Sequence, residues 1–226
     1  IAAGRVAVNG AAVTRLGTAV DPGRAAVALD GRPVALPDRL THILLNKPAG
    51  FVVTMSDPPG RRTGAELVEG AGARVVPVGR LDAATEGLLL LTDDGELAHR
   101  VAHPSFELDK VYLVEARGVL AEEERRRLET GVPLDGRMTS PASVTVLSTD
   151  GNRTVAEITL HEGRKRQVRL MFEAVGHRVT RLVRVRLGPL TLGGLEPGRW
   201  RPLTAAELAA LRAAVGLGPA PDRPAP

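Results

Sequence analysis

The sequence predicts an α+β fold with a mixed, largely antiparallel sheet. Short strand-like apolar runs outnumber helical patterns, and the few helices do not alternate with them as they would around a parallel sheet. With 226 residues and 43% hydrophobic content, the chain can bury a sizeable core. No apolar run reaches the length of a membrane span. Because Cys is absent, disulfides, thiolate catalysis and Cys-ligated metals are excluded, and we expect a cytoplasmic protein.

Three parts are expected along the chain: a small β module with its linker, a main body and a disordered tail. Val6 and Val8 predict the module because they alternate toward the hairpin turn Asn9-Gly10. The tail is predicted from its Gly, Pro and Ala content. The three parts cover residues 1–36, 37–215 and 216–226. Further turn and linker signals in and after the module are Asp21-Pro22-Gly23, Asp30-Gly31, Pro33 and Pro37.

Within the main body, short apolar runs predict strands, and periodic segments with capping residues predict helices. The strands are expected at Ile43–Leu45, Phe51–Val53, Val75–Val78, Leu88–Leu91, Val111–Ala116, Val144–Leu147 and Val155–Leu160. The helices are expected from Thr92 or Asp93 to a point before Pro104, at Ala121–Thr130 closed by Gly131, at Arg164–Val175 followed by Gly176, and after a capping box of Thr204 and Glu207.

A polar loop separates the strands expected at Val75–Val78 and Leu88–Leu91. It contains Arg80, Asp82 and Glu86. Catalytic groups are commonly presented on loops that rigid strands hold in place, so Asp82 is a candidate catalytic carboxylate. A hairpin connection with a solvated Asp would produce the same local pattern, and the loop alone leaves both interpretations open.

One predicted helix carries an apolar stripe with an arginine at its border. Val168, Met171, Phe172 and Val175 fall at helical spacing and should face the core. Arg169 lies beside this stripe and should be half-buried. A half-buried Arg favours a carboxylate partner, although an Arg that only covers the edge of the stripe would fit the same position.

Basic residues are concentrated late in the chain. From Arg164 to Arg186 there are eight basic residues and one acidic residue, Glu173, so this segment carries +7. Such a face is expected to bind a polyanion, most simply nucleic acid, although an Arg-rich genome also places Arg on ordinary surfaces. Tyr112, the only tyrosine, lies within a predicted strand. It could be a core residue or could stack on an unpaired base.

The histidines do not predict a metal site. His99 and His103 are four residues apart, but the segment between them lacks the Glu of a zinc hydrolase, and Pro104 ends the helix at once. We therefore expect no metal and no cofactor. His177 is expected to order the turn after its helix.

Four segments of the main body, taken together, match a known pattern. They are Gly79-Arg80-Leu81-Asp82 with Glu86-Gly87-Leu88-Leu89-Leu90-Leu91-Thr92, His103-Pro104-Ser105 with Lys110-Val111-Tyr112, Glu162-Gly163-Arg164-Lys165-Arg166-Gln167-Val168-Arg169, and Val175-Gly176-His177 with Leu182 and Gly188-Pro189-Leu190. Their order and spacing resemble the ribosomal pseudouridine synthase family, specifically its RsuA/RluB branch. Residues 1–36 resemble the later part of the S4-type RNA-binding domain of that branch, without its opening helices.

The resemblance implies an isomerase that detaches uracil from its ribose and reattaches it through carbon-5, with no cofactor. Asp82 would be the catalytic carboxylate, acting on the anomeric carbon, on carbon-6 of the base or on a sugar proton. Arg169 would pair with Asp82, orient it and favour its charged form. Tyr112 would stack on the extracted uracil, and Leu182 would form the apolar floor beneath it. Glu86 is left as a structural residue because the family pattern uses one carboxylate.

The implied partner is ribosomal RNA, with the large-subunit RNA favoured over the small, and we expect the protein to act as a monomer. A non-catalytic RNA-binding or ribosome-assembly factor is an alternative. A hydrolase ranks last, because Asp82 lacks a nearby Ser/His pair or a convincing second carboxylate. The residues expected to contact RNA phosphates are Lys47, Arg80, Lys110, Arg164, Lys165, Arg166, Arg178, Arg184 and Arg186.

Overall fold

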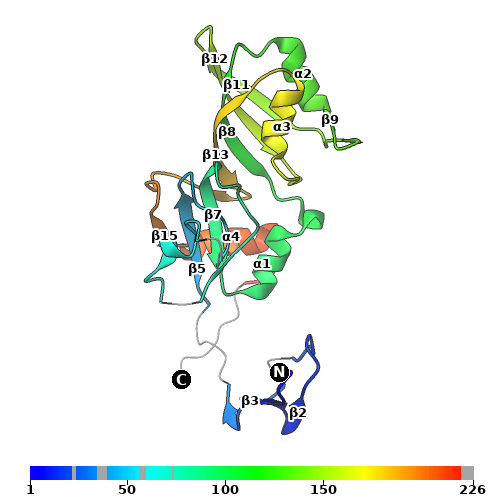
Figure 1. The fold of residues 1–226 in the computed structure, drawn as a ribbon, viewed down its shortest axis with the longest axis vertical. Helices are drawn as coiled ribbons and strands as arrows, with labels where there is room; N and C mark the ends of the chain where they lie inside the picture. Colours follow the sequence, from blue (N-terminus) through cyan, green and yellow to red (C-terminus); the bar gives the residue numbers. More distant parts are fainter. Residues whose placement is uncertain (22–23, 35–39, 56–59, 73, 220–226) are drawn as a thin grey trace. The chain divides into compact units, whose positions relative to one another are not determined.

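The computed structural model of the chain describes residues 1–21, 24–34, 40–55, 60–72 and 74–219. Two compact units are present, one at Ile1–Leu40 and one at Thr41–Pro221, and both are drawn in Figure 1. The predicted turn at Pro22-Gly23, the linker proline Pro37 and residues 220–226 of the predicted tail lie outside the described residues.

The first unit contains a four-stranded antiparallel sheet. Its strands, in spatial order, are β2 (Ala11–Val13), β1 (Val6–Val8), β3 (Val27–Leu29) and β4 (Arg32–Pro33). Asn9 and Gly10 have φ angles of 51° and 83°. Two successive residues with positive φ form the tight turn that matches the twist of a hairpin. The hairpin predicted from Asn9-Gly10 is therefore confirmed.

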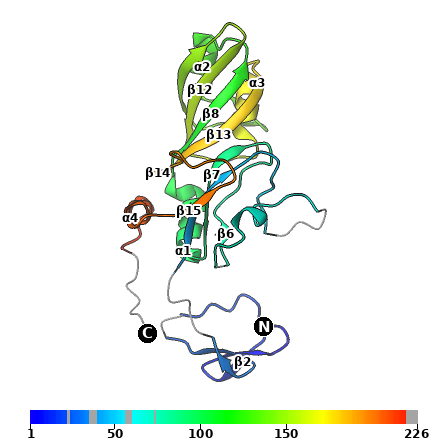
Figure 2. The same ribbon diagram turned by 90° about the vertical axis from the view of Figure 1, so that its left-hand side faces the viewer.

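The second unit is built on a single mixed sheet, which Figure 2 shows from the side. Its main path runs β11-β12-β8-β13-β7-β5-β15, with β14 beside β13 and β6 beside β7. Every pair is antiparallel except β13 with β7, so the predicted fold class is confirmed. The strands are β5 (His42–Lys47), β6 (Val76–Pro77), β7 (Glu86–Thr92), β8 (Lys110–Arg117), β11 (Ser143–Thr149), β12 (Arg153–Leu160), β13 (Val179–Leu187), β14 (Leu190–Thr191) and β15 (Trp200–Pro202).

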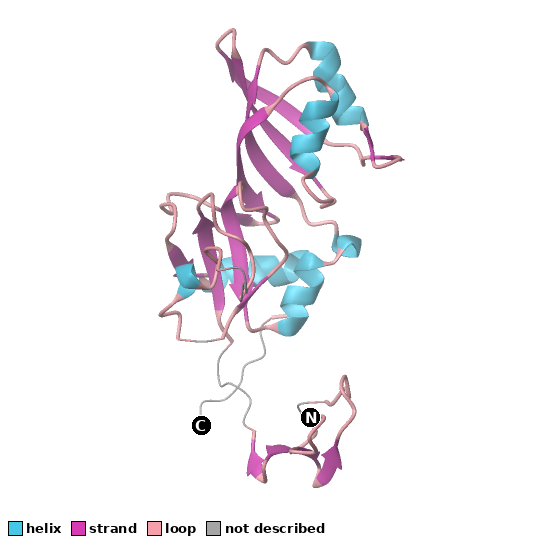
Figure 3. Cartoon of the chain, in the orientation of Figure 1, coloured by secondary structure: helices cyan, strands magenta, loops and turns pink. Residues whose placement is uncertain are grey.

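Four α-helices cover parts of this sheet within the described residues. Figures 1 and 3 show α2 and α3 on one face of the half-sheet that contains β8, β11 and β12, and the core there includes Leu128, Met171 and Phe172. Around β7, a second core packs side chains of α1 and α4 against the sheet. The remaining elements are α1 (Gly95–Ala102), α2 (Glu122–Thr130), α3 (Gln167–Ala174), α4 (Ala205–Ala214), the 3-10 turns η1 (Glu66–Val68) and η2 (Pro104–Phe106), and the ribbon of β9 (Pro133–Leu134) and β10 (Arg137–Met138).

Three sequence predictions about element boundaries are wrong. Phe51–Val53 is not a strand, and only Val52 forms an isolated bridge, with Thr63. The residue that caps α1 is Asp94, whose Oδ1 accepts from Leu97 N at 3.0 Å, rather than Thr92 or Asp93. The helix predicted from Arg164 begins at Gln167, because Arg166 adopts a left-handed conformation with φ of 55°.

The parallel pair β7–β13 joins the two halves of the sheet at Gly87. Gly87 pairs with Arg184 and has a φ of 101°. A Cβ atom at this position would lie 2.3 Å from Arg184 O and 2.7 Å from Arg184 N, distances that no side chain tolerates. Only glycine therefore allows the two strands to meet here, and the loop that contains Asp82 leads directly into this junction.

Candidate active site

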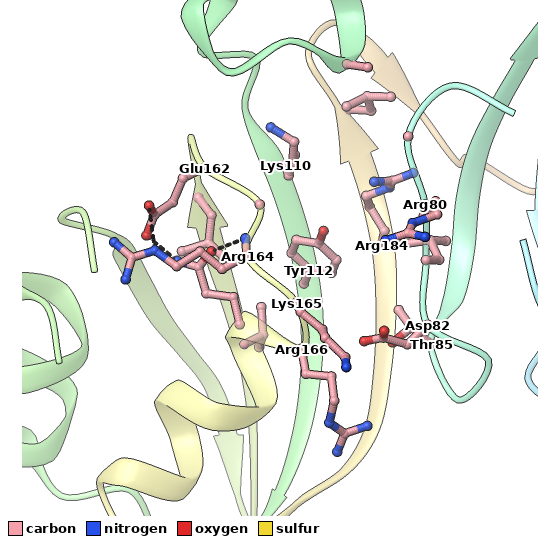
Figure 4. A pocket seen from close by; sticks show the side chains of 18 of the residues that line it. Arg80, Asp82, Thr85, Lys110, Tyr112, Glu162, Arg164, Lys165, Arg166 and Arg184 are labelled. Carbon is pink, nitrogen blue, oxygen red and sulfur yellow. Dashed lines mark hydrogen bonds and ion pairs between the residues drawn. The ribbon is translucent and has the colours of Figure 1, made fainter. Parts of the chain in front are cut away.

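A cavity of about 280 Å³ opens beside the β7–β13 junction. Its walls come from the loop before β7, from β8 and β13, and from the segment between β12 and α3 (Figure 4). Asp82, Tyr112 and Leu182 all line it, so three of the four residues implied as catalytic share one pocket. Leu182 is buried and Tyr112 is partly buried, and both pack against the core beneath this half of the sheet.

Asp82 has an unoccupied carboxylate. Its backbone carbonyl accepts from Thr85 N at 2.9 Å, which closes the tight turn of the loop. Within the part of the chain that is described, no hydrogen bond or ion pair engages its side chain. The oxygens of this half-buried carboxylate are therefore free to contact a molecule in the cavity.

Arg169 does not pair with Asp82, so the predicted ion pair is absent from this structure. Its Nη2 donates to Ala84 O at 2.9 Å and its Nη1 donates to Val179 O at 3.1 Å. Burial lowers the pKa of Arg169 and the charge of Arg166 lowers it further, whereas Asp82 acts in the opposite direction. Arg169 thus stays within electrostatic reach of Asp82 but holds the loop through a backbone carbonyl.

Lys47 cannot contact RNA phosphates, and its predicted role is wrong. The side chain is fully buried, and its Nζ donates to Pro48 O and Phe51 O at 2.9 Å and to Ala83 O at 3.3 Å. Burial lowers the pKa of Lys47 to about 8, against a smaller opposing effect of the Glu86 and Asp82 carboxylates. Lys47 instead ties the turn after β5 to the loop that contains Asp82.

Glu86, the first residue of β7, forms an ion pair with Arg181. Its two oxygens accept from Arg181 Nε at 3.0 Å and Arg181 Nη2 at 3.1 Å. A bidentate pair of this kind uses both carboxylate oxygens. Glu86 is therefore already occupied, in contrast to Asp82.

Six of the basic residues predicted to meet RNA fall into three groups. Arg80, Lys165 and Arg166 are exposed and line the cavity without a partner among the described residues, and Figure 4 shows them around Asp82. Arg164 lines it too, but it is engaged by Glu162 and by two backbone carbonyls. Arg178 and Arg186 lie outside the cavity, where Arg178 is exposed and Arg186 pairs with Asp109 at 3.6 Å.

Lys110 and Arg184 also line the cavity, but they are less exposed than Arg80, Lys165 and Arg166. Arg184 is buried, and its Nε donates to Leu88 O at 2.8 Å. Lys110 Nζ donates to Leu108 O at 3.0 Å. Burial lowers the pKa of Lys110, and the neighbouring charge of Arg184 lowers it further. Arg184, which was expected to contact RNA phosphates, is therefore a buried residue of the cavity wall.

Two features of the site were missed at the level of sequence. Thr85 is buried beside Asp82, and its hydroxyl has no partner among the residues that the structure describes. A Thr in a polar loop carries no signal that could have revealed this. Gly87 is the other feature, and its place directly before a long apolar run was the available hint.

The histidines form no metal site among the described residues. His103 Nδ1 is close to Ser105 Oγ at 2.7 Å and helps to cap η2. His177 lies just beyond α3, with Nδ1 2.7 Å from Arg117 O and Nε2 3.0 Å from Glu124 Oε2. Burial would lower the pKa of His177, but these two hydrogen bonds raise it. Its position agrees with the ordering of the turn that was expected from the sequence.

Comparison with known proteins gives a consistent result. A family model described as RNA pseudouridylate synthase matches residues 41–174. An uncharacterized RNA pseudouridine synthase of Aquifex aeolicus is 46% identical over 215 residues, which cover 95% of this chain and 86% of that protein. Ribosomal large subunit pseudouridine synthase B of Bacillus subtilis is 41% identical over 217 residues, which cover 95% of this chain and 88% of that protein. A crystal structure described as pseudouridylate synthase superposes with a TM-score of 0.71 at 31% identity, and the match covers 92% of this chain and 89% of that chain.

Fold, pocket and relatives together define an enzyme that rearranges a base within RNA. The chain belongs to the RNA pseudouridylate synthase family, whose reaction converts uridine to pseudouridine. The resemblance drawn from the four sequence segments is confirmed, including its RsuA/RluB-type branch. No helix among the described residues is long and apolar enough to cross a membrane.

Proposed function

We propose that this protein converts a uridine of large-subunit ribosomal RNA to pseudouridine, with Asp82 as the catalytic carboxylate. The observation that carries the proposal is the cavity that places the unoccupied carboxylate of Asp82 beside Tyr112 and Leu182. The choice of large-subunit RNA is supported by the name of the Bacillus subtilis relative.

The reaction requires a base that has left its stack, because stacking hides the bond that must break. The N1–C1′ bond breaks, uracil turns, and a C5–C1′ bond forms. One proton leaves C5 and one is gained at N1, so no oxidant or energy donor is consumed. Asp82 would react with the sugar or the base, Tyr112 would stack on the free uracil, and Leu182 would support its other face. Lys165 and Arg166 reach toward the cavity (Figure 4) and would attract the RNA backbone.

The remaining expectations follow the same proposal. Arg169 would act by fixing the Asp82 loop through Ala84 O. Arg80 would contact phosphate beside the target, and Arg178 and Arg186 would contact it further away. We also propose that the protein acts as a cytoplasmic monomer, since its relatives are bacterial and ribosomal RNA is made there. The first unit would contribute RNA affinity as a partial S4-type module.

The test compares three proteins on unmodified transcripts of both ribosomal RNAs. Wild type, Asp82→Asn and Asp135→Asn are incubated with each RNA, and pseudouridine is mapped by carbodiimide labelling and reverse-transcription stops. Asp135 is an exposed aspartate in the β9–β10 turn with a φ of 50°, which Asn also tolerates, so it is a matched control.

We expect a new stop in the large-subunit RNA with wild type and Asp135→Asn and none with Asp82→Asn. A stop in the small-subunit RNA alone would identify that alternative substrate. A stop that persists in Asp82→Asn, or no stop with wild type, would overturn the proposal. In the second case, retained RNA binding would favour a non-catalytic factor.

A further inference from the structure

Arg184 has an enclosed positive charge that the protein does not neutralise. Its only hydrogen bond among the described residues is from Nε to Leu88 O. Its Nη2 is buried without a partner, whereas Nη1 is not enclosed in this way, and the side chain lines the cavity. An enclosed guanidinium normally has a carboxylate or another anion beside it, because removal of the charge from water is costly.

Asp109, the residue directly before Lys110, is paired with other cations. Asp109 pairs with His161 at 2.8 Å and with Arg186 at 3.6 Å. Lys110, on the neighbouring strand, also lines the cavity, and its Nζ contacts only backbone carbonyls within the described chain. Burial and the charge of Arg184 lower the pKa of Lys110, whereas Asp109 acts in the opposite direction. Arg184 and Lys110 thus line one cavity, and neither forms an ion pair with a carboxylate of the described chain, including the unoccupied carboxylate of Asp82.

The strand register gives the order of these residues along the cavity. Arg184 on β13 lies directly opposite Tyr112 on β8. Because the two strands are antiparallel, Leu182 lies one two-residue step to one side of this pair and Lys110 lies one two-residue step to the other side. Each such step spans about 7 Å. Arg184 is therefore level with Tyr112, and Lys110 lies beyond both on the side away from Leu182.

We propose that Arg184 and Lys110 form a phosphate subsite that holds the RNA phosphate next to the target uridine. This inference rests on the proposed function, because it assumes that the cavity receives the flipped nucleotide. A uracil carbonyl is a weaker candidate for these residues, since a neutral oxygen would leave both charges without compensation. The subsite would hold the phosphate beside the base, on the side of Tyr112 away from Leu182.

The test uses the five-nucleotide RNA AAUAA with normal linkages, or with a neutral methylphosphonate either 5′ or 3′ of the uridine. Binding is measured by fluorescence anisotropy at low salt, in the Asp82→Asn background so that the RNA is not converted. With Arg184 and Lys110 intact, one of the two neutral linkages should weaken binding by about tenfold, the scale of one strong charge-assisted contact. In Arg184→Gln, normal RNA should bind about tenfold more weakly, and the same neutral linkage should cause little further loss.

Arg117→Gln is the matched control because Arg117 is an exposed arginine on β8, the strand that carries Lys110, but lies outside the cavity. It should retain the full sensitivity to the neutral linkage. If Arg184→Gln and Arg117→Gln respond equally to it, or if the parent protein does not respond to either linkage, the subsite does not exist. If circular dichroism shows that Arg184→Gln does not fold, two other variants test the proposal. Lys110→Gln should reduce the sensitivity of binding to the neutral linkage, and the charge-retaining Arg184→Lys should preserve part of it.

The outcome is separable from that of the proposed function. Binding to the phosphate is read without catalysis, whereas pseudouridine is mapped by labelling. Coupling between Arg184 and one linkage in a protein that forms no pseudouridine would support the subsite and refute the reaction. Pseudouridine formation without such coupling would do the reverse.

Discussion

Replacement of Gly87 by Ala should destabilise this protein by more than the backbone strain of an alanine at positive φ would predict. The new Cβ would lie 2.3 Å from Arg184 O and 2.7 Å from Arg184 N, and Gly87 has a φ of 101°. Two costs therefore add, the strain of a left-handed alanine and the displacement of a backbone that cannot rotate away. Because β13 also carries Leu182 into the cavity, the same displacement should lower pseudouridine formation.

The two costs can be separated with Gly136→Ala. Gly136 has a φ of 76°, and no atom lies within 4 Å of the place that a Cβ would take, so Ala there suffers only the backbone strain. That strain is worth about 1 kcal/mol. Overpacking against a rigid neighbour adds about 1–3 kcal/mol, and contact with two backbone atoms places Gly87→Ala at the upper end. We expect losses of about 1 kcal/mol for Gly136→Ala and about 4 kcal/mol for Gly87→Ala.

Urea unfolding followed by circular dichroism measures the difference directly. The midpoint of Gly87→Ala should fall well below that of Gly136→Ala, and its melting temperature should fall by about 10 °C. A difference in unfolding free energy below about 1 kcal/mol between the two variants would refute the reasoning. It would mean that β7 and β13 can separate at their junction at little cost.

Two further predictions concern charges around the same loop. In Lys47→Met, Ala83 O loses a donor and the loop should shift, which lowers pseudouridine formation by about tenfold or more. As the pH rises, Lys47 loses its proton near pH 8 in the folded protein and near pH 10.5 in the unfolded chain. Between these two pH values, the unfolding free energy of wild type relative to that of Lys47→Met should therefore rise, by at most about 3 kcal/mol. An unchanged difference between the two proteins in urea titrations across this pH range would contradict the prediction. Glu86→Gln breaks a partly exposed pair with Arg181, so it should cost about 1 kcal/mol or less and leave the yield of pseudouridine within about twofold of wild type. A loss in Glu86→Gln as complete as in Asp82→Asn would show that Glu86 takes part in catalysis.

Local patterns predicted most elements of the fold because apolar runs and capping residues act over a few positions. The capping box of Thr204 and Glu207 opens α4 as expected, with Thr204 Oγ1 accepting from Glu207 N at 3.2 Å. The start of α3 was not predictable in the same way. Arg164 donates to the carbonyls of Arg137 and Met138, 27 and 26 residues earlier. The residue that makes these long-range hydrogen bonds lies outside the helix, which begins only at Gln167.

The composition of the site was easier to predict than the burial of its cations. Asp82, Tyr112 and Leu182 were assigned through motif resemblance, and one cavity contains all three. Lys47 and Arg184 were assigned to RNA because basic residues are usually solvated. Their burial depends on which strands flank β5 and β13, and neighbours in a sheet are set by topology rather than by adjacent sequence. No local pattern distinguishes a lysine at a sheet centre from one at a sheet edge.

The loop that contains Asp82 is held by cations that bind its backbone rather than its carboxylate. One cation comes from β5, one from α3 and one from β13. The bonds are Lys47 Nζ to Ala83 O at 3.3 Å, Arg169 Nη2 to Ala84 O at 2.9 Å and Arg184 Nε to Leu88 O at 2.8 Å. An ion pair to Asp82 would also have fixed the residue, but it would have occupied the oxygens that a substrate must reach. Donation to the carbonyls of Ala83, Ala84 and Leu88 fixes the backbone that follows Asp82 while the carboxylate stays unoccupied. Preorganisation of this kind is what a reacting group needs before its substrate arrives.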